Sequence, residues 1–149
     1  YGGYAALMSA VREPELYRCA GSIAGVSDLR ALKSQQRRFY GGRAGSNFAI
    51  GSDDDELKAG SPLRAVGRIQ VPVLMVHGDA DVNVVIDHSR NMARALDKAN
   101  KPTKLVIVKD GDHSLVPGEW RTIAFTELEL FLAENLRQPT PTAVQSAAH

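Results

Sequence analysis

VPVLMVHGDADVN, residues 71–83, joins an unbroken apolar run to a short polar segment. The run Val71–Val76 holds valine, leucine and methionine with one proline and no charge, which is typical of a strand buried on both faces of a parallel sheet. The segment that follows is rich in glycine, aspartate and asparagine, which is typical of a loop. Functional groups of open parallel sheets gather at the carboxyl ends of the strands, so this loop is the first candidate for chemistry.

Helical and extended patterns alternate along the rest of the chain. Short apolar runs at 19–23 and 104–108 predict two further buried strands. Helical spacing or helix-forming composition predicts helices over 4–11, 29–38, 84–100 and 119–136. An acidic segment predicts a short helix after 53–56. A glycine-rich composition predicts a loop over 40–52. The alternation predicts an α/β fold, a three-layer αβα sandwich with about three parallel strands. Three strands are few for such a sheet, so we expect at least one edge to pair with strands from elsewhere.

Composition excludes several classes of protein. The 149 residues are 44% apolar and 23% charged, as in a globular domain. Eighteen basic and 17 acidic residues leave a net charge of +1, which argues against a nucleic-acid partner. A single cysteine, Cys19, excludes an internal disulfide and a cysteine-rich metal site. No segment approaches the ~20 apolar residues of a membrane span, so we expect no membrane partner and a soluble protein of the cytoplasm or the periplasm.

Two predicted strands end close to an aspartate and a histidine. Asp81 lies a few residues beyond the strand that ends at Val76, and His113 lies a few residues beyond the strand that ends at Val108. An aspartate that orients a histidine, which then acts as a general base, is two thirds of an acyl-transfer triad. The order of acid before histidine is that of the α/β-hydrolases, in which the nucleophilic serine comes first.

A nucleophilic serine in the Gly-x-Ser-x-Gly frame is missing from the sequence. Ser22 lies in GSIAG, one residue out of frame. The chain opens with Tyr1-Gly2-Gly3-Tyr4 and a helix-forming segment, which would fit the residues just after the serine. We therefore expect the serine immediately before Tyr1, a partial hydrolase domain at residues 1–137, a flexible tail at 138–149, and a chain that is inactive alone.

These motifs together resemble the prolyl oligopeptidase family of serine peptidases, which includes dipeptidyl peptidases and acylaminoacyl peptidases. The resemblance rests on YGGYAAL at residues 1–7, on Ser61-Pro62, on VPVL followed by HGxxDxxV at residues 71–84, and on Gly111-Asp112-His113. It implies the carboxyl-terminal half of an α/β-hydrolase domain, without the first half and the propeller. It also implies peptide-bond hydrolysis through a Ser-Asp-His triad and an acyl-enzyme, peptide substrates, no cofactor and no metal.

The resemblance also implies a role for individual residues. Asp81 would be the triad acid, His113 the base, and the backbone N–H of Tyr1 a donor of the oxyanion hole. The residues that would contact substrate are Asn83, Val84 and Val26. Where dipeptidyl peptidases place tyrosines around the pocket, this chain has Ala31, Leu32 and Gln35, which argues against a strict preference for proline.

Other interpretations of these residues remain open. Asp81 could cap the next helix, and His113 could be an ordinary loop histidine. His77 is better explained as a structural residue than as a catalyst. The acids and histidines around both loops lack a tight metal-ligand frame. The parent could be an esterase or lipase of the same fold, and the chain itself could be a non-catalytic half that pairs, through its open sheet edge, with a second copy or with the missing half.

Overall fold

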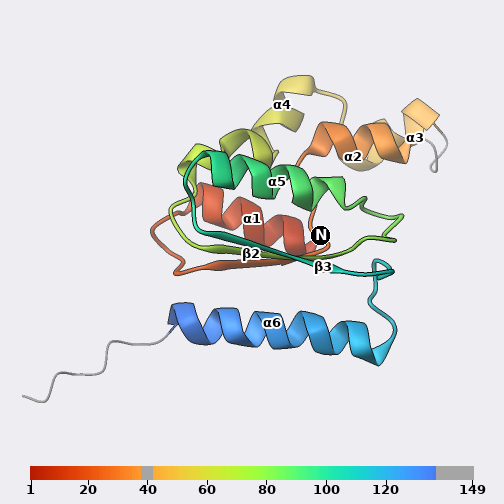
Figure 1. The fold of residues 1–149 in the computed structure, drawn as a ribbon. Helices are drawn as coiled ribbons and strands as arrows, with labels where there is room; N and C mark the ends of the chain where they lie inside the picture. The colour runs from red at the N-terminus through yellow and green to blue at the C-terminus, as the bar shows by residue number, and fades with distance from the viewer. Residues whose placement is uncertain (38–41, 137–149) are drawn as a thin grey trace, which may run out of the picture.

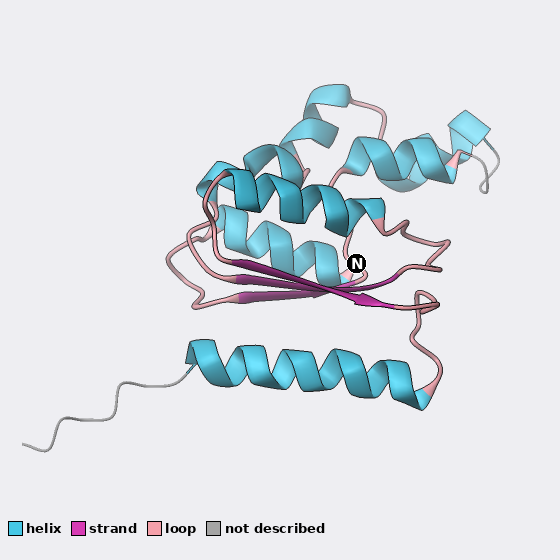
Figure 2. Ribbon diagram, in the orientation of Figure 1, coloured by secondary structure: helices cyan, strands magenta, loops and turns pink. Residues whose placement is uncertain are grey.

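A computed structural model describes residues 1–37 and 42–136. Its centre is a sheet of three parallel strands in the order β1-β2-β3, formed by Ala20–Ile23, Val73–Gly78 and Thr103–Val108 (Figures 1 and 2). All three strands were expected, with ends that differ by one or two residues. β2 starts at Val73 rather than Val71, because Pro72 has no N–H to donate, although its carbonyl accepts a bond from the N–H of Ala20 at 2.9 Å.

The central strand is buried along its whole length. All six residues of β2 are buried, and Val73, Leu74, Met75 and Val76 have no exposed surface. β1 pairs with one edge of β2 from Ala20↔Val73 to Ile23↔Val76, and β3 pairs with the other edge from Val73↔Thr103 to Gly78↔Val108. The continuous apolar run at 73–76 therefore has the physical cause that the sequence indicated: this strand has water on neither face.

Helices cover both faces of the sheet and complete the expected three-layer αβα sandwich. α1 (Gly2–Arg12) and α5 (Asp87–Lys98) lie on one face, and α6 (Gly118–Leu136) lies on the other (Figure 1). On the first face Met75 packs in one core with residues such as Leu7 and Met92. On the second face Leu74 and Val76 share a core with Phe131. Alternate residues of one strand thus fill two separate cores, as the pleat requires.

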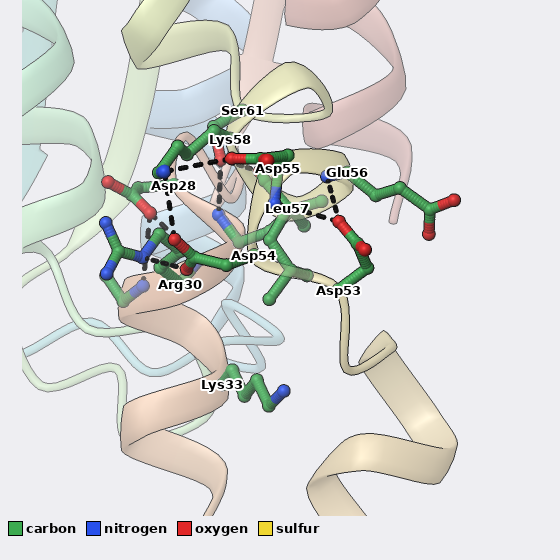
Figure 3. A network of polar contacts seen from close by, with 12 residues as sticks. Asp28, Arg30, Lys33, Asp53, Asp54, Asp55, Glu56, Leu57, Lys58 and Ser61 are labelled. Carbon is green, nitrogen blue, oxygen red and sulfur yellow. Dashed lines mark hydrogen bonds and ion pairs between the residues drawn. The ribbon is translucent and has the colours of Figure 1, made fainter.

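The remaining helices stand beyond the α1 and α5 layer (Figure 1). They are α2 (Leu29–Gln36), α3 (Gly42–Ile50), α4 (Asp54–Ala59) and the 3₁₀ helix η1 (Pro62–Arg68). Asp28 and Asp53 cap α2 and α4 by accepting backbone N–H groups. The predicted start of α2 is confirmed, whereas α4 starts at Asp54 and so includes the acidic residues that were expected to precede it. Figure 3 shows how α2 and α4 are joined: the guanidinium of Arg30 lies 2.8 Å from the carboxylate of Asp54, which also binds Lys58 at 3.0 Å.

The prediction of a loop over 40–52 was wrong for residues 42–50, while residues 40 and 41 lie outside the described residues. Residues 42–50 form α3, whose buried Ser46 donates a hydrogen bond to the carbonyl of Arg43 at 3.1 Å. Glycine lowers helix propensity by only about 1 kcal/mol, and packing of one face can outweigh that. That packing is present here, because Ile50 at the end of α3 lies against the cluster of Val26, Leu32 and Val84.

Three other predicted boundaries either differ in the structure or lie outside its described residues. α5 starts at Asp87 rather than Val84, because the backbone N–H groups of Asn83 and Val84 are held in a turn by the carboxylate of Asp81. The predicted end of α2 at Arg38 and the predicted tail at 138–149 lie outside the described residues.

None of the helices formed by residues 1–37 and 42–136 combines the length and the apolar character that crossing a membrane requires.

The sheet ends at β1 within the described part of the chain, where β1 pairs only with β2. Beside this edge, α6 carries an apolar groove lined by Phe125, Leu128, Glu129, Leu132, Ala133 and Leu136. Leu128 connects the two features, because its side chain packs under Gly21 of β1. The expected unfilled edge of the sheet is therefore continuous with an exposed apolar surface.

Candidate active site

The loops that follow β2 and β3 pack against each other through two glycines. A Cβ atom on Gly78 would overlap the carbonyl group of Gly111, and one on Gly111 would lie 3.0 Å from the Cα of Gly78. The N–H of Ala80 donates to the carbonyl of Gly111 at 3.0 Å, and the N–H of Asp110 donates to the carboxylate of Asp79 at 2.6 Å. The two backbones can approach this closely only because neither position has a side chain.

This contact brings Asp81 and His113 together, as the sequence predicted. Nδ1 of His113 lies 2.7 Å from Oδ2 of Asp81. The other oxygen, Oδ1, accepts the N–H groups of Asn83 at 2.8 Å and Val84 at 2.9 Å. The side chain of Asp81 is fully buried, whereas that of His113 is 35% exposed. The carboxylate is therefore fixed inside the protein, and the imidazole reaches the surface.

The electrostatics of the pair set its protonation. Burial alone would raise the pKa of Asp81. Hydrogen bonds from His77, Val84 and His113 together outweigh this effect and lower the pKa to about 2. An ionised carboxylate only accepts hydrogen bonds, so the proton of the His113 ring belongs on Nδ1. In the neutral form of the ring, Nε2 is then the unprotonated nitrogen, which is the state that a general base needs.

Ser22, which lies one residue out of the nucleophile frame in the sequence, has a packing role in the structure. Ser22 is 1% exposed and donates a hydrogen bond to the carbonyl of Gly3 at 3.1 Å. Gly3 and Gly25 are in such close contact that a Cβ on Gly3 would lie 2.7 Å from the Cα of Gly25. The first turn of α1 is thereby packed onto the loop after β1, with Ser22 beneath both.

A cavity of about 380 Å³ opens beside His113. It brings together Tyr1, Val26, Asn83 and Val84, the four other residues that sequence reasoning assigned to the site. The remaining lining residues are Tyr4, Ala24, Leu32, Gln36 and Val82. Apart from His113, no side chain in this lining can carry a charge near neutral pH. An uncharged group of a ligand therefore fits this cavity best.

The helix α2 contributes differently from the expectation. Leu32 lines the cavity, but Ala31 does not, and Gln35 instead donates to the carbonyls of Val82 and Asn83 at 3.0 and 3.2 Å. Gln36 and Tyr4 line the cavity and were not singled out from the sequence. The helical spacing was the available signal, since Tyr4 follows Tyr1 by three positions and Gln36 follows Leu32 by four.

The loop that carries Val26 is held by α5. Both Ser27 and Asp28 direct backbone N–H groups at Nδ1 of His88, at 3.2 and 3.4 Å, and the hydroxyl of Ser27 donates to the carbonyl of His88 at 2.8 Å. Burial lowers the pKa of His88, which suits an imidazole that must accept hydrogen bonds.

Among residues 1–37 and 42–136, no three histidine, cysteine or acidic side chains cluster in a way that could hold a metal ion.

A parallel sheet covered on both faces, with an acid and a histidine meeting beyond adjacent strands, places the chain in the α/β-hydrolase class of folds. The sequence profile of the Prolyl oligopeptidase family matches residues 1–139, and the chain belongs to this family. It is similar to a solved structure of Pyrococcus horikoshii acylaminoacyl peptidase, with a TM-score of 0.80, 19% identity, and coverage of 95% of this chain and 24% of that one.

Relatives by sequence include both active and inactive proteins. Prolyl endopeptidase FAP of Mus musculus is 26% identical over 139 residues, 90% of this chain and 17% of that protein. Inactive dipeptidyl peptidase 10 of Mus musculus is 27% identical over 111 residues, 74% of this chain and 13% of that protein. The chain thus spans less than a fifth of either relative, and family membership by itself leaves its own activity to be tested.

The contact between the two glycines predicts the effect of a single methyl group. Gly78→Ala should destabilise the chain by about 1–3 kcal/mol, because the new Cβ displaces the backbone at Gly111. Gly67→Ala is the matched control, since a Cβ there meets no atom within 4 Å. It should change the free energy of unfolding by less than about 1 kcal/mol. Urea denaturation measures both, and equal effects would contradict the close packing of the loops.

The low pKa of Asp81 predicts how stability depends on pH. The folded-state pKa of about 2 lies below the ordinary value of 3.8, so unfolding binds a proton between these values. The stabilisation is complete above about pH 5 and is lost as the pH falls toward 2. The difference in unfolding free energy between the wild type and Asp81→Asn should therefore shrink over that range. A difference that stays constant from pH 6 to pH 3, measured by chemical denaturation, would contradict the assignment.

Proposed function

We propose that this chain supplies the acid and the base of a serine peptidase whose nucleophile immediately precedes Tyr1. The observation that carries the proposal is the 2.7 Å contact between Nδ1 of His113 and Oδ2 of the buried Asp81, beside a largely uncharged cavity. Membership of the prolyl oligopeptidase family supports the same reaction. In this proposal the partial hydrolase domain occupies residues 1–137.

Each residue has a distinct step in the proposed reaction. The serine hydroxyl attacks the carbonyl carbon of the peptide bond, and Nε2 of His113 takes its proton. The oxygen of the tetrahedral intermediate gains a negative charge and accepts a hydrogen bond from the N–H of Tyr1. His113 then returns the proton to the leaving amine, and water releases the acyl group in the same way. Throughout, Asp81 orients the imidazole and stabilises its charged form.

The cavity lining indicates the substrate side chain. Val26 and Val84 line it with apolar side chains, and Asn83, which also lines it, would contact a substrate carbonyl. Leu32 and Gln36 occupy the α2 side of the cavity. A peptide with an uncharged side chain before the scissile bond fits this lining, and nothing in it enforces proline. No cofactor takes part in the proposed reaction.

The proposal predicts the effect of removing either group from the full-length protein. Asp81→Ala and His113→Ala should each lower kcat for a peptide amide by ~10⁴-fold, whereas the exposed Asp87→Ala serves as the matched control. A fluorophosphonate probe should label the full-length protein but not the isolated 149-residue chain. Near-normal turnover by either variant would overturn the assignment of the acid or the base. Hydrolysis of short acyl esters without peptide amides would favour an esterase or lipase.

A non-catalytic assembly role rests on a separate observation, the unfilled edge of β1 beside the apolar groove of α6. The N–H groups of Ala20 and Ala24 point toward β2, so those of Gly21 and Ile23 face the open side by the alternation of a strand. Such an edge can pair with a strand of a second copy or of the rest of the hydrolase domain.

Size-exclusion chromatography of the isolated chain tests this surface. We expect self-association that rises with concentration, or a stable complex when the upstream half of the domain is added. Phe125→Lys, which places a charge in the groove, should weaken either association. Leu16→Lys is the control, because Leu16 is also exposed (71%, against 58% for Phe125) but lies outside the groove. A monomer at every concentration that ignores the upstream half would contradict the assembly role.

A further inference from the structure

His77 is a fully buried histidine at the end of the central strand, and it contacts three polar groups. Its Nδ1 lies 2.7 Å from the hydroxyl of Ser89 in α5. Its Nε2 lies 2.8 Å from the carbonyl of Val84 and 3.2 Å from Oδ2 of Asp81. One ring therefore touches the acid of the candidate site, a wall residue of the cavity and the helix α5 that covers the sheet.

The partners of His77 determine where its proton lies. Carbonyl and carboxylate oxygens only accept hydrogen bonds, so Nε2 must carry the proton and share it between Val84 and Asp81. The hydroxyl of Ser89 can donate, so a neutral ring accepts it at Nδ1. A neutral His77 protonated on Nε2 satisfies all three contacts at once.

We propose that His77 is a positioning residue, which holds the carboxylate of Asp81 so that its remaining acceptor site faces His113. This inference rests on the proposed function. The Asp81 oxygens receive four N–H groups: two from the backbone on Oδ1, and those of His77 and His113 on Oδ2. Without the His77 donor, His113 would be the only group bonded to Oδ2, so the position of this oxygen would be less restrained.

The charges around His77 come from both loops and from α5. Asp81 and His113 approach it from the loops after β2 and β3, and His88 of α5 is close enough to interact with it electrostatically. The pKa of His88 is lowered, chiefly by burial. Asp81 is thus the one acidic group in direct contact with His77 among the described residues. The ring and the carboxylate consequently form a single unit whose hydrogen bond can be removed selectively.

Two amide substitutions separate the contacts of the ring. In His77→Gln the amide nitrogen takes the place of Nε2, so the donor to Asp81 and Val84 is kept while the acceptor for Ser89 is lost. In His77→Asn the shorter side chain reaches the Ser89 side, and the donor to Asp81 is lost. If His77 were only a buried structural residue, the Gln variant would have no reason to keep the Asp81 titration or the turnover closer to the wild type than the Asn variant does.

The first readout is the titration of the Asp81 carboxyl group, followed by carbon-13 NMR in the isolated chain. His77→Asn should raise the midpoint, because the charged form loses a donor, and His77→Gln should leave the midpoint near that of the wild type. The second readout is kinetics in the full-length protein. There His77→Asn should lower kcat about 10- to 100-fold with KM within about twofold, and His77→Gln should recover most of that loss.

Ser89→Ala keeps the test decisive if His77→Asn fails to fold. It removes the hydroxyl that holds Nδ1, and it should shift both readouts in the same direction by a smaller amount. Ser22→Ala is its matched control, a buried serine with one hydrogen bond outside this unit, and should not move the Asp81 midpoint. An unchanged midpoint in both His77→Asn and Ser89→Ala, or equal losses in the Asn and Gln variants, overturns the positioning role. A full-length wild type without peptidase activity overturns the proposed function instead, and the carboxyl titration then decides whether His77 holds Asp81.

Discussion

The buried carboxylate of Asp81 links the parts of this molecule that matter for its chemistry. Its two oxygens accept N–H groups from the turn before α5, from His77 in β2 and from His113 in the loop after β3. Four donors compensate for the loss of water around the charge, which is why the pKa falls despite burial. A neutral asparagine or an exposed aspartate would not hold three separate segments in one arrangement.

Close backbone contacts make that arrangement possible. Gly78 and Gly111 let the two loops touch, and Gly3 and Gly25 let the first turn of α1 rest on the loop after β1. Both pairs lie at the carboxyl ends of the strands, where the cavity opens. Because these glycines let the loops lie close together, side chains on the loops, such as those of Asp81 and His113, come into contact. In a serine peptidase of this family, the proposed reaction would take place in the space between these contacts.

The role of His77 changes when its contacts are considered together. As a lone buried histidine at a strand end, it is most simply a core residue with satisfied hydrogen bonds. Its Nε2 proton, however, faces the same carboxylate oxygen as His113 does. Packing of α5 supplies Ser89 to the other side of the ring, so the helix that covers the sheet also sets the orientation of the proposed catalytic acid.

The sequence by itself determined the parallel sheet, the order of acid before histidine and the family. The apolar run Val73–Val76 indicates burial directly, and the motif HGxxD places Gly78 where the loop backbone must approach its neighbour closely. The prediction from sequence failed at α3, where glycines suggested a loop. The packing of Ile50 against Val26 and Leu32 outweighs the low helix propensity of those glycines. The sequence also could not show that Gln36 rather than Gln35 lines the cavity, or that His77 contacts Asp81. Those facts depend on the rotation of a helix and on the meeting of segments distant in sequence, and only tertiary packing sets either one.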